Sequence, residues 1–84
     1  MKKLLKKLDP DLLYADGFDD CILGMTFREE VPVVLYSTQK IIKKLMNDMS
    51  DTDAWDHYWF NIEGAYVGAR TPIFFDICVE EDDT

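Results

Sequence analysis

The sequence predicts an α+β fold: a small three-stranded antiparallel sheet, made of a hairpin and a C-terminal strand, packed against a pair of helices. Two apolar runs rich in β-branched and aromatic residues, at residues 21–27 and 31–36, flank a short polar turn, which is typical of a β-hairpin. Two stretches with apolar side chains at helical spacing follow. A third apolar run at residues 73–79 completes the expected order (α)ββααβ.

The length of 84 residues allows one domain, residues 1–84, without a linker or a repeat. Apolar residues make up 48% of the chain and charged residues 31%, which is ordinary globular usage. A chain this short buries only about 60% of the surface that it exposes when unfolded, so we expect a narrow margin of stability.

The N-terminal segment, residues 1–8, contains four of the nine basic residues and none of the 17 acids. Leu4, Leu5 and Leu8 form a one-sided stripe that suits a short helix. We favour a basic helix that lies on the acidic remainder of the chain. A flexible arm, or a contact with a membrane surface or a nucleic acid, is the alternative. After it, Asp9-Pro10 predicts a brief helical piece through Tyr14, and Asp16-Gly17 predicts a turn.

The hairpin is expected to carry two irregular positions. Gly24 interrupts the first strand and predicts a bulge or a close neighbour, and Pro32 must lie at the beginning of the second strand or on an edge. Arg28-Glu29-Glu30 supplies the turn between the strands.

Each predicted helix begins at a cluster of capping residues. Ser37 or Thr38 caps the first helix, and the cluster at residues 50–53 caps the second. The apolar stripe of the first helix consists of Ile41, Ile42, Leu45, Met46 and Met49. The stripe of the second consists of Trp55, Trp59, Ile62 and Tyr66. Gly64 indicates a close approach or the helix end, and Gly68 a helix stop.

The last strand is predicted at residues 73–79, after Thr71-Pro72, and an acidic tail follows at residues 80–84. The net charge of −8 and the pI near 4.3 argue against a nucleic-acid ligand, because phosphate binding needs a basic face. No apolar run has the roughly 18 residues of a membrane span, and no secretory signal is recognised. We therefore expect a cytoplasmic protein in which Cys21 and Cys78 are reduced thiols, although neighbouring strands would allow them to meet.

Three carboxylates, Asp16, Asp19 and Asp20, form the densest polar cluster. They could hold Ca²⁺ or Mg²⁺, but the spacing is not that of a calcium-binding loop, and a turn stabilised by local side-chain hydrogen bonds is the favoured interpretation. His57 is the only histidine and is expected in solvent. We assign no catalytic residue, no metal ligand and no cofactor.

The aromatic residues of the second helix are the most unusual local feature. Trp55, Trp59 and Tyr66 are expected to fill the core, which leaves Tyr58 or Phe60 to face elsewhere. An exposed aromatic beside acids suits an anchor for a partner protein, unless the N-terminal helix or the hairpin covers it. Asn61 has no propensity advantage in a helix, so we expect its amide to bond a loop backbone, with the Asp16–Asp20 turn as the candidate.

Three segments carry a resemblance to a known family. They are D-G-F-D-D-C-I-L-G from Asp16, V-L-Y-S-T-Q-K-I-I-K-K-L-M from Val34, and F-N-I-E-G-A-Y-V-G-A-R-T-P-I-F from Phe60. In these segments the chain resembles a family of short acidic proteins encoded by tailed bacteriophages, over roughly residues 12–75. The resemblance implies an intracellular viral protein that is expressed during infection. It transfers no catalytic residue, because the family has no assigned activity.

The leading functional hypothesis is a non-enzymatic protein–protein interaction module that acts on a host or phage protein. Its binding residues would be Asp16, Asp19 and Asp20 together with Tyr58 or Phe60. A sharper form is an inhibitor that mimics DNA and occupies a basic cleft. One alternative is a metal-dependent or hydrolytic enzyme, which requires Asp19 and His57 to converge in one pocket. Another is a structural homodimer through Tyr58 or Phe60, since a small domain gains burial by pairing.

Overall fold

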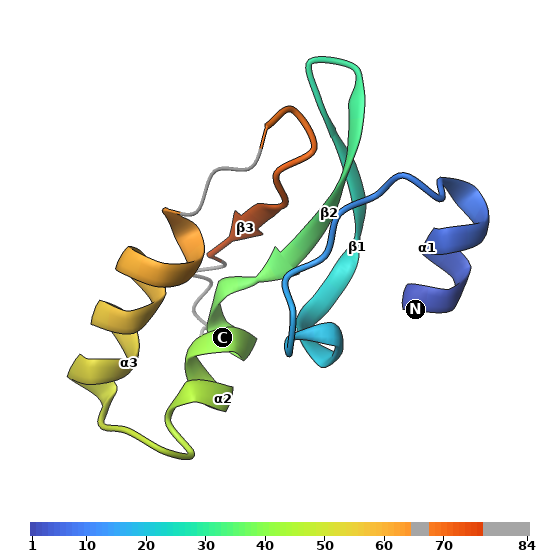
Figure 1. Ribbon diagram of the computed structural model, residues 1–84. Helices are drawn as coiled ribbons and strands as arrows, with labels where there is room; N and C mark the ends of the chain where they lie inside the picture. The colour runs from blue at the N-terminus through green and yellow to red at the C-terminus, as the bar shows by residue number, and fades with distance from the viewer. Residues whose placement is uncertain (65–67, 77–84) are drawn as a thin grey trace, which may run out of the picture.

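The computed structural model describes residues 1–64 and 68–76 and has the predicted α+β fold (Figure 1). The predicted order of elements, αββααβ, is confirmed. The elements are α1 (Lys2–Leu8), a 3₁₀ turn η1 (Asp19–Cys21), β1 (Ile22–Arg28), β2 (Val31–Ser37), α2 (Thr38–Leu45), α3 (Asp51–Tyr58), a π-helical segment η2 (Trp59–Glu63) and β3 (Ile73–Phe75).

The sheet is mixed, so the prediction of a purely antiparallel sheet is wrong for its third strand. The strand order is β1-β2-β3, with β1 antiparallel to β2 and β3 parallel to β2. Figure 1 shows the reason: α3 runs back alongside the sheet against the direction of β2, so the chain enters β3 from the hairpin end. Parallel neighbours need a long crossover of this kind, whereas a short turn reverses the chain.

The hairpin has both predicted irregular positions. The pairing register shifts between Ile22 and Gly24, which is the bulge expected at that glycine. Pro32 pairs with Phe27 near the start of β2, while β3 contacts β2 only from Leu35 onward. The missing N–H of Pro32 is therefore at a place where β2 has a neighbour on one side only.

Both helices of the pair begin at the predicted serine caps. The Ser37 hydroxyl accepts a hydrogen bond from the backbone N–H of Lys40 at 3.1 Å, and the Ser50 hydroxyl accepts one from Asp53 at 3.2 Å. In contrast, the helical piece predicted after Asp9-Pro10 is absent from the structure. The Asp9 carboxylate accepts a hydrogen bond from the backbone N–H of Asp11 at 3.0 Å. The chain forms a local turn here in place of the helix.

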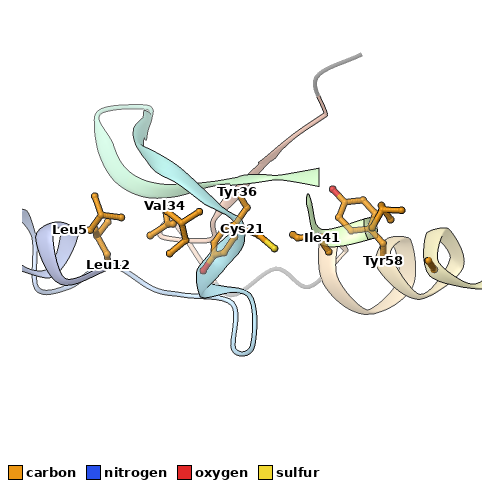
Figure 2. Close-up of a cluster of buried hydrophobic side chains, with 10 residues drawn as sticks. Leu5, Leu12, Cys21, Val34, Tyr36, Ile41 and Tyr58 are labelled. Carbon is orange, nitrogen blue, oxygen red and sulfur yellow. The ribbon is translucent and has the colours of Figure 1, made fainter. Parts of the chain in front are cut away.

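The core lies on the face of the sheet that carries Val34 and Tyr36, and it extends into the helices (Figure 2). Phe74 is the register partner of Tyr36 and stacks on it with ring centroids 5.5 Å apart. The buried apolar residues of this cluster are Leu5, Leu12, Cys21, Ile22, Val34, Tyr36, Ile41, Ile42, Ala54 and Tyr58. Cys21 is a free thiol, whereas Cys78 and the tail at residues 80–84 lie outside the described residues, as do the predicted strand positions 77–79.

The basic N-terminal segment forms the predicted helix, α1, and packs on the rest of the chain. Leu5 is 3% exposed, and the Lys2 ammonium lies 3.2 Å from the Asp19 carboxylate. Leu4 and Leu8 remain exposed. Within the described ranges, none of the helices has both the length and the apolar character that crossing a membrane requires.

Candidate functional site

Two of the three clustered carboxylates form intramolecular ion pairs. Asp19 pairs with Lys2, and Asp20 pairs with Lys44 at 2.9 Å. The hydrogen bond from Lys44 holds the pKa of Asp20 below its usual value. Lys44 also donates to the backbone carbonyl of Gly17 at 2.8 Å, so the pair ties this loop to α2.

Asp16, the third carboxylate, is separated from the other two and lies at the rim of a pocket. Across residues 1–64 and 68–76, no three histidine, cysteine, aspartate or glutamate side chains gather closely enough to hold a metal ion.

The pocket has a volume of about 340 Å³ and lies between the loop before η1, the helical segment α3–η2 and strand β3. It is positioned by Tyr36, whose hydroxyl accepts the backbone N–H of Ala15 at 2.7 Å and whose ring stacks on Phe74. The lining residues are Leu13, Tyr14, Ala15, Asp16, Phe18, His57, Asn61, Ile62, Pro72 and Phe74. The walls are thus mainly apolar and aromatic, with a few polar groups, as in sites that bind small molecules.

The polar groups on the helical side of the pocket are His57 and Asn61. His57 is exposed, as predicted, and its Nδ1 lies 3.3 Å from the amide nitrogen of Asn61 one turn later. The expected bond from the Asn61 amide to the Asp16–Asp20 turn is not found among the described residues, where its partner is His57. The pocket that includes His57 does not include Asp19, so the convergence that the enzyme alternative required is not found.

The hydroxyl of Tyr14, in the wall of the pocket, is buried and has no hydrogen-bond partner in the part of the chain that the structure describes. The Lys2 ammonium lies over its ring, 4.8 Å from the ring centroid. A buried hydroxyl without a partner costs about 1–3 kcal/mol.

The buried stripe of α3 differs from the prediction by one residue. Tyr58 is 2% exposed, and its hydroxyl lies 2.9 Å from the Thr38 hydroxyl, while Ala54 one turn earlier is fully buried. Burial raises the pKa of Tyr58. Tyr58 is thus a core residue and is not available to a partner, contrary to its assignment as a candidate binding residue.

Trp59 and Phe60 face outward from η2, with 52% and 82% of their surface exposed. The exposure of Phe60 agrees with the prediction, whereas Trp59 was expected in the core. Trp59 is held in place by ring contacts with Tyr58 at 5.4 Å and with Trp55 at 6.4 Å between centroids. Tyr66, the last member of the predicted stripe, lies outside the described residues.

The helical segment that carries these two aromatic residues is acidic. The segment from residue 51 to residue 63 contains neither lysine nor arginine, and its acids are Asp51, Asp53, Asp56 and Glu63, all exposed. We call Trp59, Phe60 and these four acids the aromatic–acidic surface.

No family model, curated protein or solved structure matches this chain. The site therefore has to be interpreted from its own geometry. The sequence singled out Phe60 and Asp16 as candidates but not Trp59 or the pocket. The pocket joins three segments that are distant in the sequence, so it has no local sequence signal.

Proposed function

We propose that this protein is a non-enzymatic binding module that docks on a partner protein through the aromatic–acidic surface. Phe60 carries the proposal, because 82% of a large apolar side chain stands in water on an ordered helical segment. Burial of an aromatic anchor commonly supplies much of the free energy of a protein–protein contact.

The chemistry of the surface indicates a partner with an apolar pocket surrounded by basic residues. Four exposed acids lie on the same helical segment as Trp59 and Phe60, and the chain as a whole carries a net charge of −8. Opposite charges at the rim of an interface accelerate association and select the partner. With the resemblance to bacteriophage proteins, this supports a partner in the host cytoplasm, of host or phage origin.

The π-helical geometry of η2 supports the same proposal. A π-helical turn is rare, and such turns occur frequently at functional sites. In this chain it directly follows the buried Tyr58 and contains both exposed aromatic residues. The DNA-mimic form draws less support, because Asp19 and Asp20 already have lysine partners.

The test compares Phe60→Ala with Phe27→Ala as bait proteins in a bacterial lysate. Phe27 is 61% exposed and lies on the hairpin, so its variant removes an exposed aromatic of the same type from another surface. A partner captured by the wild type is then purified, and its affinity for each variant is measured by calorimetry at low and high salt.

We expect Phe60→Ala to weaken binding by about 2 kcal/mol, or roughly 30-fold, with Phe27→Ala unchanged. Salt should weaken wild-type binding because it screens the acids. Equal affinities of the wild type and Phe60→Ala for every captured protein would contradict the proposal. Circular dichroism establishes that both variants fold.

A further inference from the structure

The geometry points to a second binding activity: the pocket at Asp16 takes a small organic cation, namely a protonated amine on an apolar body. This inference rests on the pocket and does not depend on the aromatic–acidic surface. The size of the pocket, its charge and the hydrogen-bond acceptors of Asp16 support it.

The size and walls suit a compact organic molecule. The volume of about 340 Å³ lies near the lower end of the range of roughly 300–1,000 Å³ for small-molecule sites. Tyr14, Phe18 and Phe74 provide aromatic walls, and Ile62 and Pro72 add apolar surface. Aromatic faces attract cations as well as apolar groups.

The described lining of the pocket carries a negative charge. Among the described lining residues, Asp16 is the only carboxylate and there is no lysine or arginine. Lys2 and Lys44 lie 4.8 and 5.8 Å from the ring centroids of Tyr14 and Phe18, but their ion pairs are with Asp19 and Asp20. Asp19 and Asp20, close by in the sequence, each have a lysine partner, whereas Asp16 forms no ion pair within the described residues. A cation is therefore the complementary ligand, and an anion would be repelled.

The hydrogen-bonding groups favour an amine over a quaternary ammonium ion. The Asp16 carboxylate can only accept hydrogen bonds. A protonated primary amine has three N–H donors and can donate to Asp16, whereas a quaternary ammonium ion has no N–H to donate. The apolar body then lies between Phe18 and Phe74.

The test uses three ligands of similar shape: 2-phenylethylammonium, the neutral 2-phenylethanol and the anion phenylacetate. Each is titrated into the full-length ¹⁵N-labelled protein, and amide shifts are followed by NMR. We expect the amine to produce saturable shifts at residues 14–18 and at the Asn61 side-chain amide. The alcohol should bind at least tenfold more weakly, and phenylacetate should cause no shifts at these positions.

Two variants provide the matched comparison. Asp16→Asn should weaken amine binding roughly tenfold, the effect of losing one charged hydrogen bond. Asp11→Asn removes the same charge from an exposed residue that does not line the pocket, so it should leave the affinity unchanged. Equal binding of the amine to Asp16→Asn and wild type, or shifts confined to other surfaces, would overturn the inference. Because Phe60→Ala should retain amine binding, a failure here is separable from a failure of the docking proposal.

Discussion

At the scale of single residues, the hydroxyl of Tyr58 determines which face of α3 is buried. It reaches the Thr38 hydroxyl at the start of α2, and both groups are buried. A buried hydroxyl is stable only where it finds a partner, and Ala54 on the same face is small enough to let the helices approach.

Replacement of Tyr58 by Phe should therefore destabilise the protein. The variant leaves the Thr38 hydroxyl buried without its partner, and we expect a loss of about 1–2 kcal/mol in the free energy of unfolding, measured by urea denaturation. The double variant Tyr58→Phe with Thr38→Val removes both polar groups. If it is no more stable than the single variant, the hydrogen bond is not what holds this contact.

The same residue shows where sequence reasoning fails. Trp55 and Trp59 form a helical stripe as regular as that of Ala54 and Tyr58, and hydrophobicity favours the tryptophans. The structure instead buries Tyr58, whose hydroxyl bonds the Thr38 hydroxyl on another helix. Periodicity identifies a helix, but it does not identify the polar partner that fixes its rotation.

At the scale of elements, the turn of the β-hairpin is strained. Glu29 and Glu30 have φ angles of 51° and 73°, a region that suits Asn and Gly and disfavours residues with long side chains. The two residues tolerate it because the strands on either side pair along their length.

Glu29→Asn combined with Glu30→Gly should stabilise the protein by about 1 kcal/mol, since these residues adopt the turn without strain. The gain would appear as a higher urea midpoint at unchanged slope. Replacement of both glutamates by glutamine removes the same charges and keeps the backbone strain, so it should increase the free energy of unfolding only slightly. If the glutamine variant is stabilised as much as the Asn-Gly variant, the removal of charge and not the relief of strain causes the stabilisation.

Most elements were predictable because their signals are local. The serine caps, the hairpin turn and the glycine bulge each depend on a few neighbouring residues. The direction of β3 was not predictable in this way. It depends on which end of the sheet the chain reaches after α2 and α3, and no local sequence signal specifies this. The pocket depends in turn on that direction, because Pro72 and Phe74 form one of its walls.

At the scale of the whole molecule, three ion pairs among the described residues join segments that are distant in the sequence. Lys2 pairs with Asp19, Lys44 with Asp20, and Arg70 with Asp9 at 2.9 Å. The hydrogen bonds from Arg70 and Lys44 hold the pKa values of Asp9 and Asp20 below the usual value of 3.8.

These lowered pKa values predict acid sensitivity. A carboxyl group whose pKa is lower in the folded state stabilises the fold above its ordinary pKa of 3.8, and this contribution is lost as the pH falls through the folded value. Urea midpoints measured from pH 7 to pH 2 should therefore fall below about pH 4.

Arg70→Gln should lower the midpoint at pH 7 and make the acid-induced decrease smaller, because Asp9 then titrates nearer its ordinary pKa. Lys6→Gln removes one positive charge from an exposed position and is the matched control. If the urea midpoints of the two variants depend on pH in the same way, the contact between Arg70 and Asp9 does not contribute to the acid sensitivity of the fold.

The parallel pairing of β2 with β3 also determines the order in which the sheet can assemble. Strands β1 and β2 are joined by a two-residue turn and can meet within microseconds, whereas β3 must close the long segment between Ser37 and Ile73. Closure of that segment costs more chain entropy before any contact offsets it. During refolding, the free edge of β2 is thus formed before its own β3 arrives, and at high protein concentration the β3 of a neighbouring molecule competes for it.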